Sequence, residues 1–381
     1  MKIALTDICD FQGGTQPPKN EWIDHEAEGY VRMLQIRDFT QSEKENIEYV
    51  KDTKNLKKCN ENDILIGRYG ASVGKILTGL SGAYNVAMVK AIPDKEKIYA
   101  RYLYYFFNSP YFQNFIKGVG FRAAQAGFNK DDLKSAVIPL LSNSEQRKIA
   151  AVLDKISDLI AKRRQQLDKL DELVKSRFIE MFGVYPANPM GWEIGTIRDI
   201  VTEVRYGSSR PAVDGGKYPY LRMNNITYGG ELDLSDTKRI DIPDNELDKC
   251  AVRRGDILFN RTNSKELVGK TCVYDRDEMM VLAGFVIRIR VKDRILPEFL
   301  SAFLNTDFSK QMLLGMCKTA IGQANINAQE LQNIGLYLPP VELQRRFVQF
   351  KKETDKSKLA IQKSLEKLET LKKALMQEYF G

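Results

Sequence analysis

Few side chains in this 381-residue chain could carry catalysis. His25 is the only histidine, so a Ser-His-Asp triad, an HExxH zinc motif and histidine general bases are excluded as repeated devices. The cysteines are odd in number, lie far apart and form no CxxC pair, which is typical of reduced residues in a cytosolic protein. The sequence therefore predicts neither a disulfide framework nor a zinc site from Cys9, Cys59, Cys250, Cys272 and Cys317.

Two stretches come close to a nucleotide-binding P-loop. GASVGKI (70–76) is one residue short of that pattern, and SKELVGKT (264–271) has Ser264 where the first glycine must stand. We interpret both as turns between strands. LPPV (338–341) lacks the Asn or Asp and the aromatic residue that an amino-methyltransferase places around its Pro-Pro, and no Gly-rich loop after a strand suggests S-adenosylmethionine binding. Asp94 and Glu96 are too close together for a nuclease site.

A set of polar residues recurs on presumed loops in both halves of the chain. Arg, Asn and Gln side chains can form two hydrogen bonds with one base edge, while Lys and Ser commonly contact phosphates. For any one residue alone, a turn or a solvated surface position is the better explanation, but both halves place the set at matching points between strands. We therefore predict a DNA-contact set. It consists of Arg68, Tyr69, Ser72, Lys75, Arg122, Gln125, Asn129 and Lys130 in the first half, and Arg222, Asn224, Asn225, Asn260, Arg261, Thr262, Asn263, Lys265, Lys318, Gln323, Asn325 and Asn327 in the second.

The elements that must position these residues are also repeated. LQIRDFT (34–40) matches LRMNNIT (221–227), NDILIGR (62–68) matches GDILFNR (255–261), and QAGFN (125–129) matches QANIN (323–327). Gln125 and Gln323 are 198 residues apart, as are Gln146 and Gln344, and Phe182 and Phe380. A repeat this long indicates a duplicated domain rather than a solenoid, whose period would be roughly 20–50 residues.

Each half ends in a long helical stretch, at residues 144–183 and 341–381. Apolar residues recur there in steps of three and four, a heptad pattern that needs a second helix to lie against it. Lys351, Thr354 and Lys358 leave the start of the second stretch less apolar. The apolar seams consist of Ile149, Leu153, Ile156, Ile160, Leu167, Leu170 and Val174 in the first stretch, and Ile361, Leu365, Leu368, Leu371 and Leu375 in the second.

The pattern predicts an α+β protein in which two similar mixed α/β domains (1–143 and 184–340) are separated by two long helices that form an antiparallel coiled coil, a pseudo-twofold repeat. An alternative is that each helix packs against its own globular segment or a partner. In the first segment we expect a short helix running into a Gly/Pro turn at 4–18. We also expect strands at 30–39, 63–69, 75–78 and 83–92, and helices at 98–108 and 110–119.

Composition limits the compartment and the partners. The net charge of +8 and the pI near 9 are compatible with a polyanionic partner, although many basic proteins bind no nucleic acid. The longest apolar stretch, Met279–Ile287, is too short to span a bilayer, and no signal peptide is evident. We therefore expect a cytoplasmic protein that does not associate with membranes.

Several motifs together resemble those of the specificity (S) subunits of type I restriction–modification systems. They are NDILIGRYG and GDILFNRT, QAGFN and QANIN, and the exits IPLLSNSEQRKI and LPPVELQRRF into the long helices. That family has two target-recognition domains separated by helices, an order that covers the whole chain. The family's Pro-x-x-Glu-Gln exit is imperfect here, because the spacer after Pro139 is longer and Leu343 precedes Gln344.

The resemblance implies a non-catalytic subunit that recognises a bipartite double-stranded DNA site. It would recruit two adenine-N6 methyltransferase (M) subunits and the restriction (R) subunits. S-adenosylmethionine, Mg and ATP would belong to those partners, so no cofactor is expected in this chain. GRYGAS and NRTNSKEL differ at matching loops, which indicates an asymmetric site. Two alternatives stay open, namely a coiled-coil interaction scaffold without DNA specificity and a stand-alone methyltransferase or nuclease with an unrecognised site.

Overall fold

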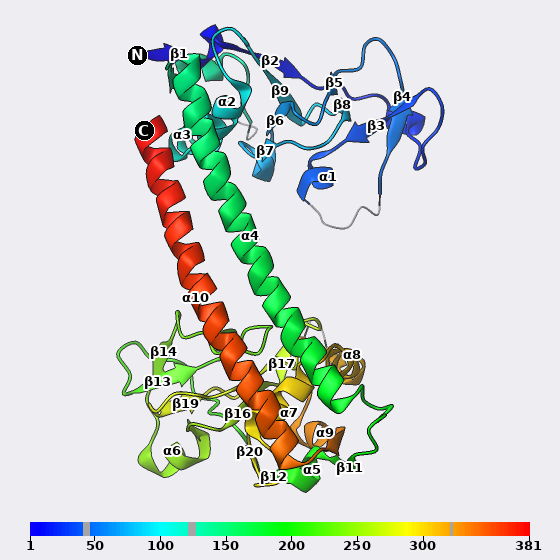
Figure 1. The fold of residues 1–381 in the computed structure, drawn as a ribbon, viewed down its shortest axis with the longest axis vertical. Helices are drawn as coiled ribbons and strands as arrows, with labels where there is room; N and C mark the ends of the chain where they lie inside the picture. Colours follow the sequence, from blue (N-terminus) through cyan, green and yellow to red (C-terminus); the bar gives the residue numbers. More distant parts are fainter. Residues whose placement is uncertain (41–45, 121–126, 321–322) are drawn as a thin grey trace. The chain divides into compact units, whose positions relative to one another are not determined.

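A computed structural model describes residues 1–40, 46–120, 127–320 and 323–381 of the chain (Figure 1). The chain forms two compact units. Unit 1 contains Met1–Arg164 and Lys363–Gly381, and unit 2 contains Gln165–Gln362. Each unit therefore holds one globular segment together with parts of both long helices, and both chain ends belong to unit 1.

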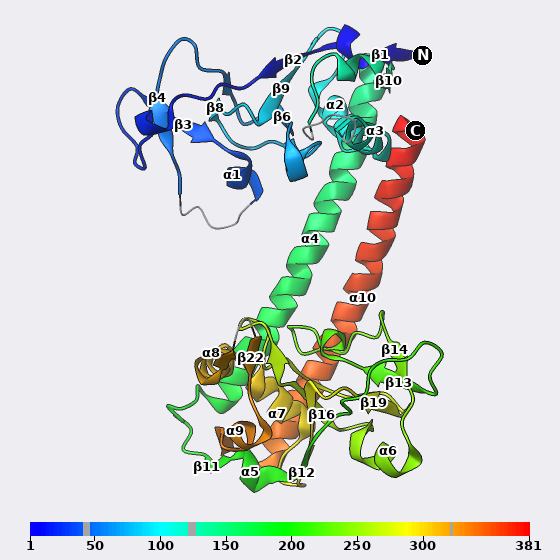
Figure 2. The same ribbon diagram turned by 180° about the vertical axis from the view of Figure 1, so that it is seen from behind.

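The first globular segment contains two four-stranded sheets. The first sheet is antiparallel throughout, and the second has one parallel pair, β3–β8. In spatial order the first sheet is β2 (Cys9–Gly13), β9 (Met88–Pro93), β6 (Ile64–Gly67) and β7 (Ile76–Leu77). The second is β4 (Tyr49–Lys51), β3 (Tyr30–Leu34), β8 (Gly82–Tyr84) and β5 (Lys58–Cys59). β1 (Lys2–Ala4) pairs with β10 (Val137–Pro139), as Figure 2 shows.

Short helices complete the first segment. Its α-helices are α1 (Ile36–Thr40), α2 (Ala100–Phe107) and α3 (Pro110–Gly120). Its 3-10 turns are η1 (Leu5–Asp7), η2 (Lys19–Glu21), η3 (Gly70–Ser72) and η4 (Asp132–Ser135). The predicted helices at 98–108 and 110–119 are thus confirmed as α2 and α3.

The second segment repeats both four-stranded sheets in the same spatial order. One sheet is β12 (Val201–Tyr206), β20 (Val286–Val291), β16 (Ile257–Asn260) and β18 (Thr271–Val273). The other is β14 (Lys238–Ile240), β13 (Tyr218–Leu221), β19 (Met280–Leu282) and β15 (Ala251–Val252), in which β13–β19 is again the parallel pair. The predicted duplication of a mixed α/β domain is therefore confirmed by strand order and by strand direction.

The remaining elements of the second segment extend this plan. β11 (Glu193–Thr196) pairs with β23 (Gly335–Leu338), and a three-stranded sheet contains β17 (Thr262–Asn263), β22 (Gln323–Asn325) and β21 (Lys318–Ala320). The helices are α5 (Ile197–Ile200), α6 (Asp244–Cys250), α7 (Pro297–Leu304), α8 (Asp307–Met316) and α9 (Ala328–Gln332), with a 3-10 turn η5 (Met223–Asn225).

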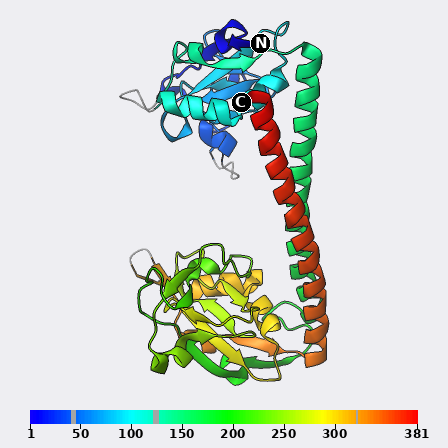
Figure 3. The ribbon, with the colours of Figure 1, turned by 90° about the vertical axis from the view of Figure 1, so that its left-hand side faces the viewer.

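The two long helices are α4 (Asn143–Phe182) and α10 (Val341–Phe380), each of 40 residues. In unit 1 the beginning of α4 packs near the end of α10, because Leu153 and Phe380 share one buried cluster. In unit 2 the end of α4 packs against the beginning of α10, where the Phe178 and Phe347 rings lie 5.2 Å apart. The pairing is antiparallel as predicted, and Figure 3 shows the two helices side by side within each unit.

Aromatic side chains anchor the long helices in the globular cores. In unit 1, Phe380 of α10 packs against Tyr102 and Phe106 of α2. In unit 2, Phe182 of α4 packs edge-on against Phe299 of α7. Burying large rings supplies apolar area and geometric preference together, so each helix end is fixed to a core rather than merely lying on it.

One residue of the predicted α10 seam lies elsewhere. Leu371 is 46% exposed, and Lys372 takes the half-buried position between Leu368 and Leu375 instead. The predicted seam takes two successive steps of three, from Leu365 to Leu368 to Leu371, and such steps rotate away from the contact stripe. Alternating steps of four and three stay on the stripe. At the polar start of α10, Lys358 forms ion pairs with Asp171 and Glu231, which accommodates its charge beside α4.

Three local predictions are wrong in the first segment. Residues 36–40 form α1 rather than strand, because the Asp38 carboxylate accepts the Gln35 N–H and closes a turn. The stretch 83–92 is two strands, β8 and β9, since Asn85 Oδ1 accepts the Ala87 N–H between them. Between β1 and β2 the chain has only the 3-10 turn η1 and no longer helix, and within β2 Cys9 and Phe11 alternate with outward polar residues.

Within the described ranges, no helix is long and apolar enough to cross a membrane. The same ranges contain no cluster of His, Cys, Asp and Glu side chains that could hold a metal ion.

Candidate nucleic-acid interface

Three neighbouring strands of the second segment begin or end side by side at one end of their sheet, which we call the candidate edge. β12 ends at Tyr206, β20 begins at Val286, and β16 ends at Asn260. Arg261 follows directly, and its backbone N–H donates to the Phe285 carbonyl at 3.0 Å. The Arg261 guanidinium therefore leaves the sheet at an edge that three strands define.

The guanidinium of Arg261 is held from two sides. It lies over the Tyr206 ring, 4.7 Å from the ring centroid, and its Nη2 donates to Asn325 Oδ1 at 3.0 Å. Cation–π contact and a hydrogen bond restrict the side chain before any ligand arrives. Arg261 and Asn325 were both predicted contact residues, and the fold brings them together.

The corresponding edge of the first segment carries Arg68. Its N–H donates to the Ala87 carbonyl at 2.8 Å, and its Nε donates to the Phe128 carbonyl at 2.9 Å. Its guanidinium lies over the ring of the next residue, Tyr69, at 5.0 Å. Each segment thus presents one arginine at the same sheet edge with a tyrosine ring beside it, although the two tyrosines come from different places in the fold.

The stretches with a near miss to the P-loop are turns after these arginines. Gly74 and Gly269 both have φ of +79°, and a Cβ there would stand 2.6 Å from Ile116 Cγ2 or 2.7 Å from Leu313 Cδ1. Such a conformation and such close packing require glycine. Both turns are therefore shaped by packing against α3 and α8.

A side chain from the neighbouring helix fastens each turn. Gln113 Nε2 donates to the Gly74 carbonyl at 2.8 Å, and Lys310 Nζ donates to the Gly269 carbonyl at 3.3 Å. Burial lowers the pKa of Lys310 to about 8, with nearby Lys270 as a further cause. The lysine thus occupies a position that in the first segment is filled by a neutral amide.

Lys270, the second lysine at this turn, also makes a structural hydrogen bond. Lys270 is 7% exposed, its Nζ donates to the Met223 carbonyl at 2.9 Å, and burial lowers its pKa. This bond connects the turn to η5, near the predicted contact residues Arg222 and Asn224. The matching Lys75 in the first segment is exposed, so it is free of this burial.

Three predicted contact residues are used by the fold itself. Asn225 is 2% exposed, and its Nδ2 donates to the Asp233 carbonyl at 2.8 Å. Asn327 caps α9, and Asn129 Oδ1 accepts the N–H of Asp131 at 2.8 Å in a turn. Amide side chains commonly satisfy backbone donors at such places. We therefore leave these three asparagines out of the contact set.

Buried polar atoms without a partner gather next to Arg261. Asn260 is fully buried and Thr262 is 7% exposed, and neither Asn260 Nδ2 nor Thr262 Oγ1 has a hydrogen-bond partner among the described residues. Arg261 Nε is likewise buried and has no hydrogen-bond partner among the described residues. Buried donors without partners are rare and costly, so three in succession mark this strand end as unusual.

The other predicted residues are less constrained or lie outside the described part. Arg222 pairs with Asp236 at 2.9 Å, and Lys130 pairs with Asp10. Asn224 and Lys265 are exposed, Tyr69 is 41% exposed, and Ser72 and Asn263 are half-buried. Arg122 and Gln125 lie outside the described residues, and for Lys318 and Gln323 only the backbone, in β21 and β22, is described.

Sequence reasoning missed two aromatic residues at this edge, Tyr206 and Phe285. Their exposed fractions are 42% and 54%. One signal was available for Tyr206. Gly13-Gly14 in the first segment corresponds to Tyr206-Gly207 in the second, so the shared second glycine marks matching strand ends. A Cβ on Gly14 would stand 2.1 Å from the Asn85 carbonyl oxygen, and one on Gly207 would stand 2.2 Å from that of Leu282.

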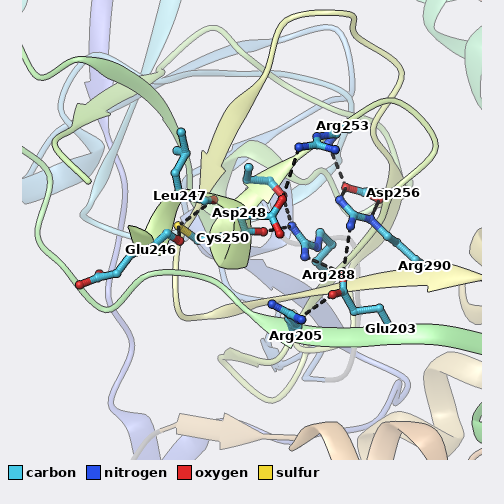
Figure 4. A network of polar contacts seen from close by, with 11 residues as sticks. Glu203, Arg205, Glu246, Leu247, Asp248, Cys250, Arg253, Asp256, Arg288 and Arg290 are labelled. Atoms are coloured by element: carbon cyan, nitrogen blue, oxygen red, sulfur yellow. Dashed lines mark hydrogen bonds and ion pairs between the residues drawn. The ribbon is translucent and has the colours of Figure 1, made fainter. Parts of the chain in front are cut away.

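A buried ion network holds the two sheets of the second segment together (Figure 4). Arg288 of β20 is 2% exposed, donates to Glu203 Oε2 at 2.6 Å, and also donates to the Ala251 carbonyl on β15 of the other sheet. Arg290 joins the network through Asp256 at 2.7 Å. The network therefore links β20 of the sheet behind the candidate edge to β15 of the other sheet.

The first segment has a reduced form of this network. Lys90 of β9 stands where Arg288 stands on β20, and its Nζ donates to the Lys58 carbonyl at 2.9 Å and to Asp63 Oδ2 at 3.3 Å. Both cations thus reach from the first sheet to a carbonyl on the edge strand of the second sheet. The duplication extends to the way in which the sheets are joined.

Comparison with known proteins gives a consistent result. A family model described as the type I restriction modification DNA specificity domain matches residues 1–172 and 189–373. The type I restriction enzyme EcoKI specificity subunit of Escherichia coli (strain K12) is 22% identical over 412 residues, covering 99% of this chain and 87% of the relative. The MjaVIII specificity subunit of Methanocaldococcus jannaschii is 28% identical over 402 residues, covering 98% and 90%.

Two solved structures share the fold. A chain from a study of complex assembly and conformational transition of the type I R-M system has a TM-score of 0.60 and 17% identity, covering 100% of this chain and 97% of that one. The type I restriction-modification S subunit from M. genitalium has a TM-score of 0.56 and 16% identity, covering 100% and 96%.

Proposed function

Since this chain belongs to the type I restriction modification DNA specificity family and is a specificity subunit, we propose that it reads a bipartite double-stranded DNA site. As a specificity subunit it is a non-catalytic component of its system. The proposal assigns one target-recognition domain to residues 1–143 and another to 184–340, with helices 144–183 and 341–381 as spacers. Each domain reads one half of the site.

One observation carries the proposal. Arg68 and Arg261 leave equivalent sheet edges, each with its backbone N–H bonded across to the neighbouring strand and its guanidinium over a tyrosine ring. Arginine is the side chain most often used to read guanine through O6 and N7 in the major groove. An arginine restrained in advance at each of two matching edges suits the reading of two half-sites.

The surroundings of the two arginines differ, which supports an asymmetric site. Thr262 follows Arg261 and is buried, whereas Tyr69 follows Arg68 and is exposed. The remaining proposed contacts in the first domain are Tyr69, Ser72, Lys75, Arg122, Gln125 and Lys130. In the second they are Arg222, Asn224, Asn263, Lys265, Lys318, Gln323 and Asn325, whereas the buried Asn260 and Thr262 are left out.

The duplicated architecture also supports two equivalent docking surfaces for partners. We assign one methyltransferase subunit to each, with restriction subunits joining that core in the cytoplasm. S-adenosylmethionine, Mg and ATP act in those subunits rather than in this chain. Native mass spectrometry of the chain with its methyltransferase should give two partners per chain, and a complex that saturates at one partner contradicts this assignment.

The DNA-reading proposal is tested with the full chain and a pool of random duplexes. Wild type should enrich two unlike half-motifs, with affinity that falls steeply as salt rises. Arg68→Ala should relax only one half-motif and Arg261→Ala only the other, at a cost of about 1–3 kcal/mol each. Arg254→Ala is the matched control, because Arg254 pairs with Asp277 away from this edge. Unchanged affinity in both variants refutes the two assigned contacts.

A further inference from the structure

The second domain carries two exposed aromatic residues where the first domain has small ones. Tyr206 pairs with Ile287 across β12 and β20, and Phe285 lies two residues before Ile287. In the first domain Gly13 pairs with Val89 across β2 and β9, and Ala87 lies two residues before Val89. The strand register therefore equates Tyr206 with Gly13 and Phe285 with Ala87.

The backbone hydrogen bonds of the two arginines confirm this correspondence. Arg261 donates its N–H to the carbonyl of Phe285, and Arg68 donates its N–H to the carbonyl of Ala87. The residue beside each arginine is thus a phenylalanine in one domain and an alanine in the other. This difference lies directly at the proposed reading edge.

Phe285 is held in a defined position although it is exposed. It lies in a tight turn, because the Val286 N–H donates to the Ala283 carbonyl at 2.9 Å. The preceding Gly284 N–H donates to the Ser208 carbonyl at 2.7 Å, which fixes the turn to the neighbouring segment. Phe285, a residue 54% exposed on a hydrogen-bonded turn, therefore presents an apolar group that a partner can contact.

Tyr206 is fixed on both sides. Its hydroxyl accepts the Ala328 N–H at 2.9 Å, and its ring lies beneath the Arg261 guanidinium. The ring therefore positions Arg261 and leaves the guanidinium edge to its ligand. The exposed ring of Phe285, by contrast, is available for contact with a ligand.

We propose that Phe285 packs on the C5-methyl group of a thymine next to the guanine that Arg261 reads, and that Tyr206 positions Arg261 for that contact. The inference deepens the proposed function and rests on it. The thymine methyl is the apolar group that base edges display in the major groove, where arginine reads guanine. The half-site of the second domain then contains a thymine adjacent to that guanine, and the half-site of the first domain does not depend on such a methyl.

In the first domain, where Gly13 stands in place of Tyr206, a cavity lies at the position without a tyrosine ring. It measures about 110 Å³ and lies beside Arg68, with Gly13, Phe11 and Phe128 among the residues that line it. A Cβ on Gly13 would stand 3.8 Å from Arg68 Nη1, an ordinary van der Waals distance. Gly13→Tyr is therefore sterically acceptable at Cβ and would place a ring beside Arg68.

The decisive experiment removes one methyl group from the DNA. Wild-type full chain first selects its site from random duplexes, and each thymine of that site is then replaced by deoxyuridine. Wild type should lose about fourfold in affinity at one thymine of the second half-site, the factor expected for burial of one methyl-sized group. Phe285→Ala should bind the thymine and deoxyuridine duplexes equally. Ile194→Ala, which removes an apolar side chain that is 61% exposed on β11, should behave as wild type.

Each other outcome has a definite meaning. A wild type that selects no site refutes the proposed function. A selected site with no sensitivity to deoxyuridine, or a Phe285→Ala variant that keeps the wild-type sensitivity, overturns only the methyl contact. A uniform loss of affinity for all duplexes in Phe285→Ala also overturns it.

The reciprocal variant tests the same contact by gain. Gly13→Tyr combined with Ala87→Phe should add a thymine preference to the half-motif of the first domain and leave that of the second unchanged. A double variant that folds and selects the wild-type motif contradicts the equivalence of the two edges.

Discussion

Gln344 makes in unit 2 the hydrogen bonds that Gln146 makes in unit 1. Both side chains are fully buried. Gln146 Oε1 accepts the Tyr99 N–H at 2.7 Å, and its Nε2 donates to the carbonyls of Lys97 and Leu141, both at 2.9 Å. A single side chain thus ties the first turn of α4 to the segment before α2 and to the segment that follows β10.

The second glutamine joins the matching parts of its own unit. Gln344 Oε1 accepts the Leu296 N–H at 2.8 Å, and its Nε2 donates to the carbonyls of Arg294 and Pro339 at 3.2 and 2.8 Å. A leucine at either position would fill similar space but leave one N–H and two carbonyls without this partner, in part-buried or buried surroundings. The glutamines are therefore expected to hold the long helices to the globular segments.

Substitution of either glutamine by leucine should destabilise the protein by about 1–3 kcal/mol per unsatisfied buried group. Hydrogen exchange should locate the loss near α2 for Gln146→Leu and near α7 for Gln344→Leu. Urea unfolding measures its size. Gln165→Leu, at an exposed position of α4, is the control and should change little. Wild-type stability in both buried variants would mean that the helices are anchored by their aromatic residues alone.

The buried network at Arg288 gives a second prediction. Arg288→Met leaves Glu203 and the Ala251 carbonyl without this partner, and should cost about 3 kcal/mol, the lower end for a broken buried ion pair, because Glu203 keeps Arg290. Arg288→Lys should cost less, since Lys90 fills this place in the first segment. Chemical denaturation gives both values.

The control for that network is Arg205→Ala. Arg205 pairs with Glu203 from the exposed side, with 44% of its side chain accessible, so its removal should cost under about 1 kcal/mol. Equal losses for Arg205→Ala and Arg288→Met would show that burial does not decide the strength of these contacts.

Lys310 should make stability depend on pH in the alkaline range. Its pKa is about 8 in the folded protein because of burial, whereas that of an unfolded lysine is 10.5. Below pH 8 the lysine is protonated in both states and its burial cost is fully present. From pH 8 upward the folded state loses this proton first, so the unfolded state binds more protons and stability rises with pH.

Lys310→Gln, which copies Gln113 of the first segment, should remove this dependence. Thermal unfolding followed from pH 7 to 9.5 should therefore show that the stability of wild type rises with pH relative to the stability of the variant. The range stops below pH 10, where tyrosines titrate in the unfolded chain. A difference that stays constant across the range would indicate that Lys310 does not titrate there.

The long helices should set the distance between the half-sites. Four residues added to both helices, near Gln165 and Lys363, lengthen each by about 6 Å. DNA rises roughly 3.4 Å per base pair, so the spacer should grow by one or two base pairs while both half-motifs persist. Some rotation is also expected, since four residues exceed one helical turn, and it can lower affinity.

Methylome sequencing of cells that carry the elongated chain with its methyltransferase measures the spacer. The same insertion in only one helix is the control and should impair activity, because the seams then pair out of register. Methylation at the original spacing, or altered half-motifs, would refute the helices as the spacer.

Local patterns were sufficient for much of the architecture. Leu153, Ile156 and Ile160 are spaced to form a helical seam, and all three are buried. Repeated motifs after matching strands identified Arg68 and Arg261 as equivalent residues. Such features depend on residues close together in the chain, whose side-chain periodicity already reflects the element they form.

The strand ends beside the arginines required the tertiary structure. Tyr206 and Phe285 are 55 and 24 residues away from Arg261 in sequence, and they meet it only because β12, β20 and β16 are neighbours. The roles of Asn225 and Asn327 likewise depended on which backbone groups the fold leaves to be capped. The sequence by itself determined the duplicated architecture and the pair of arginines. Only the tertiary structure decided what surrounds each arginine, because long-range strand pairing has no local periodicity from which it could be predicted.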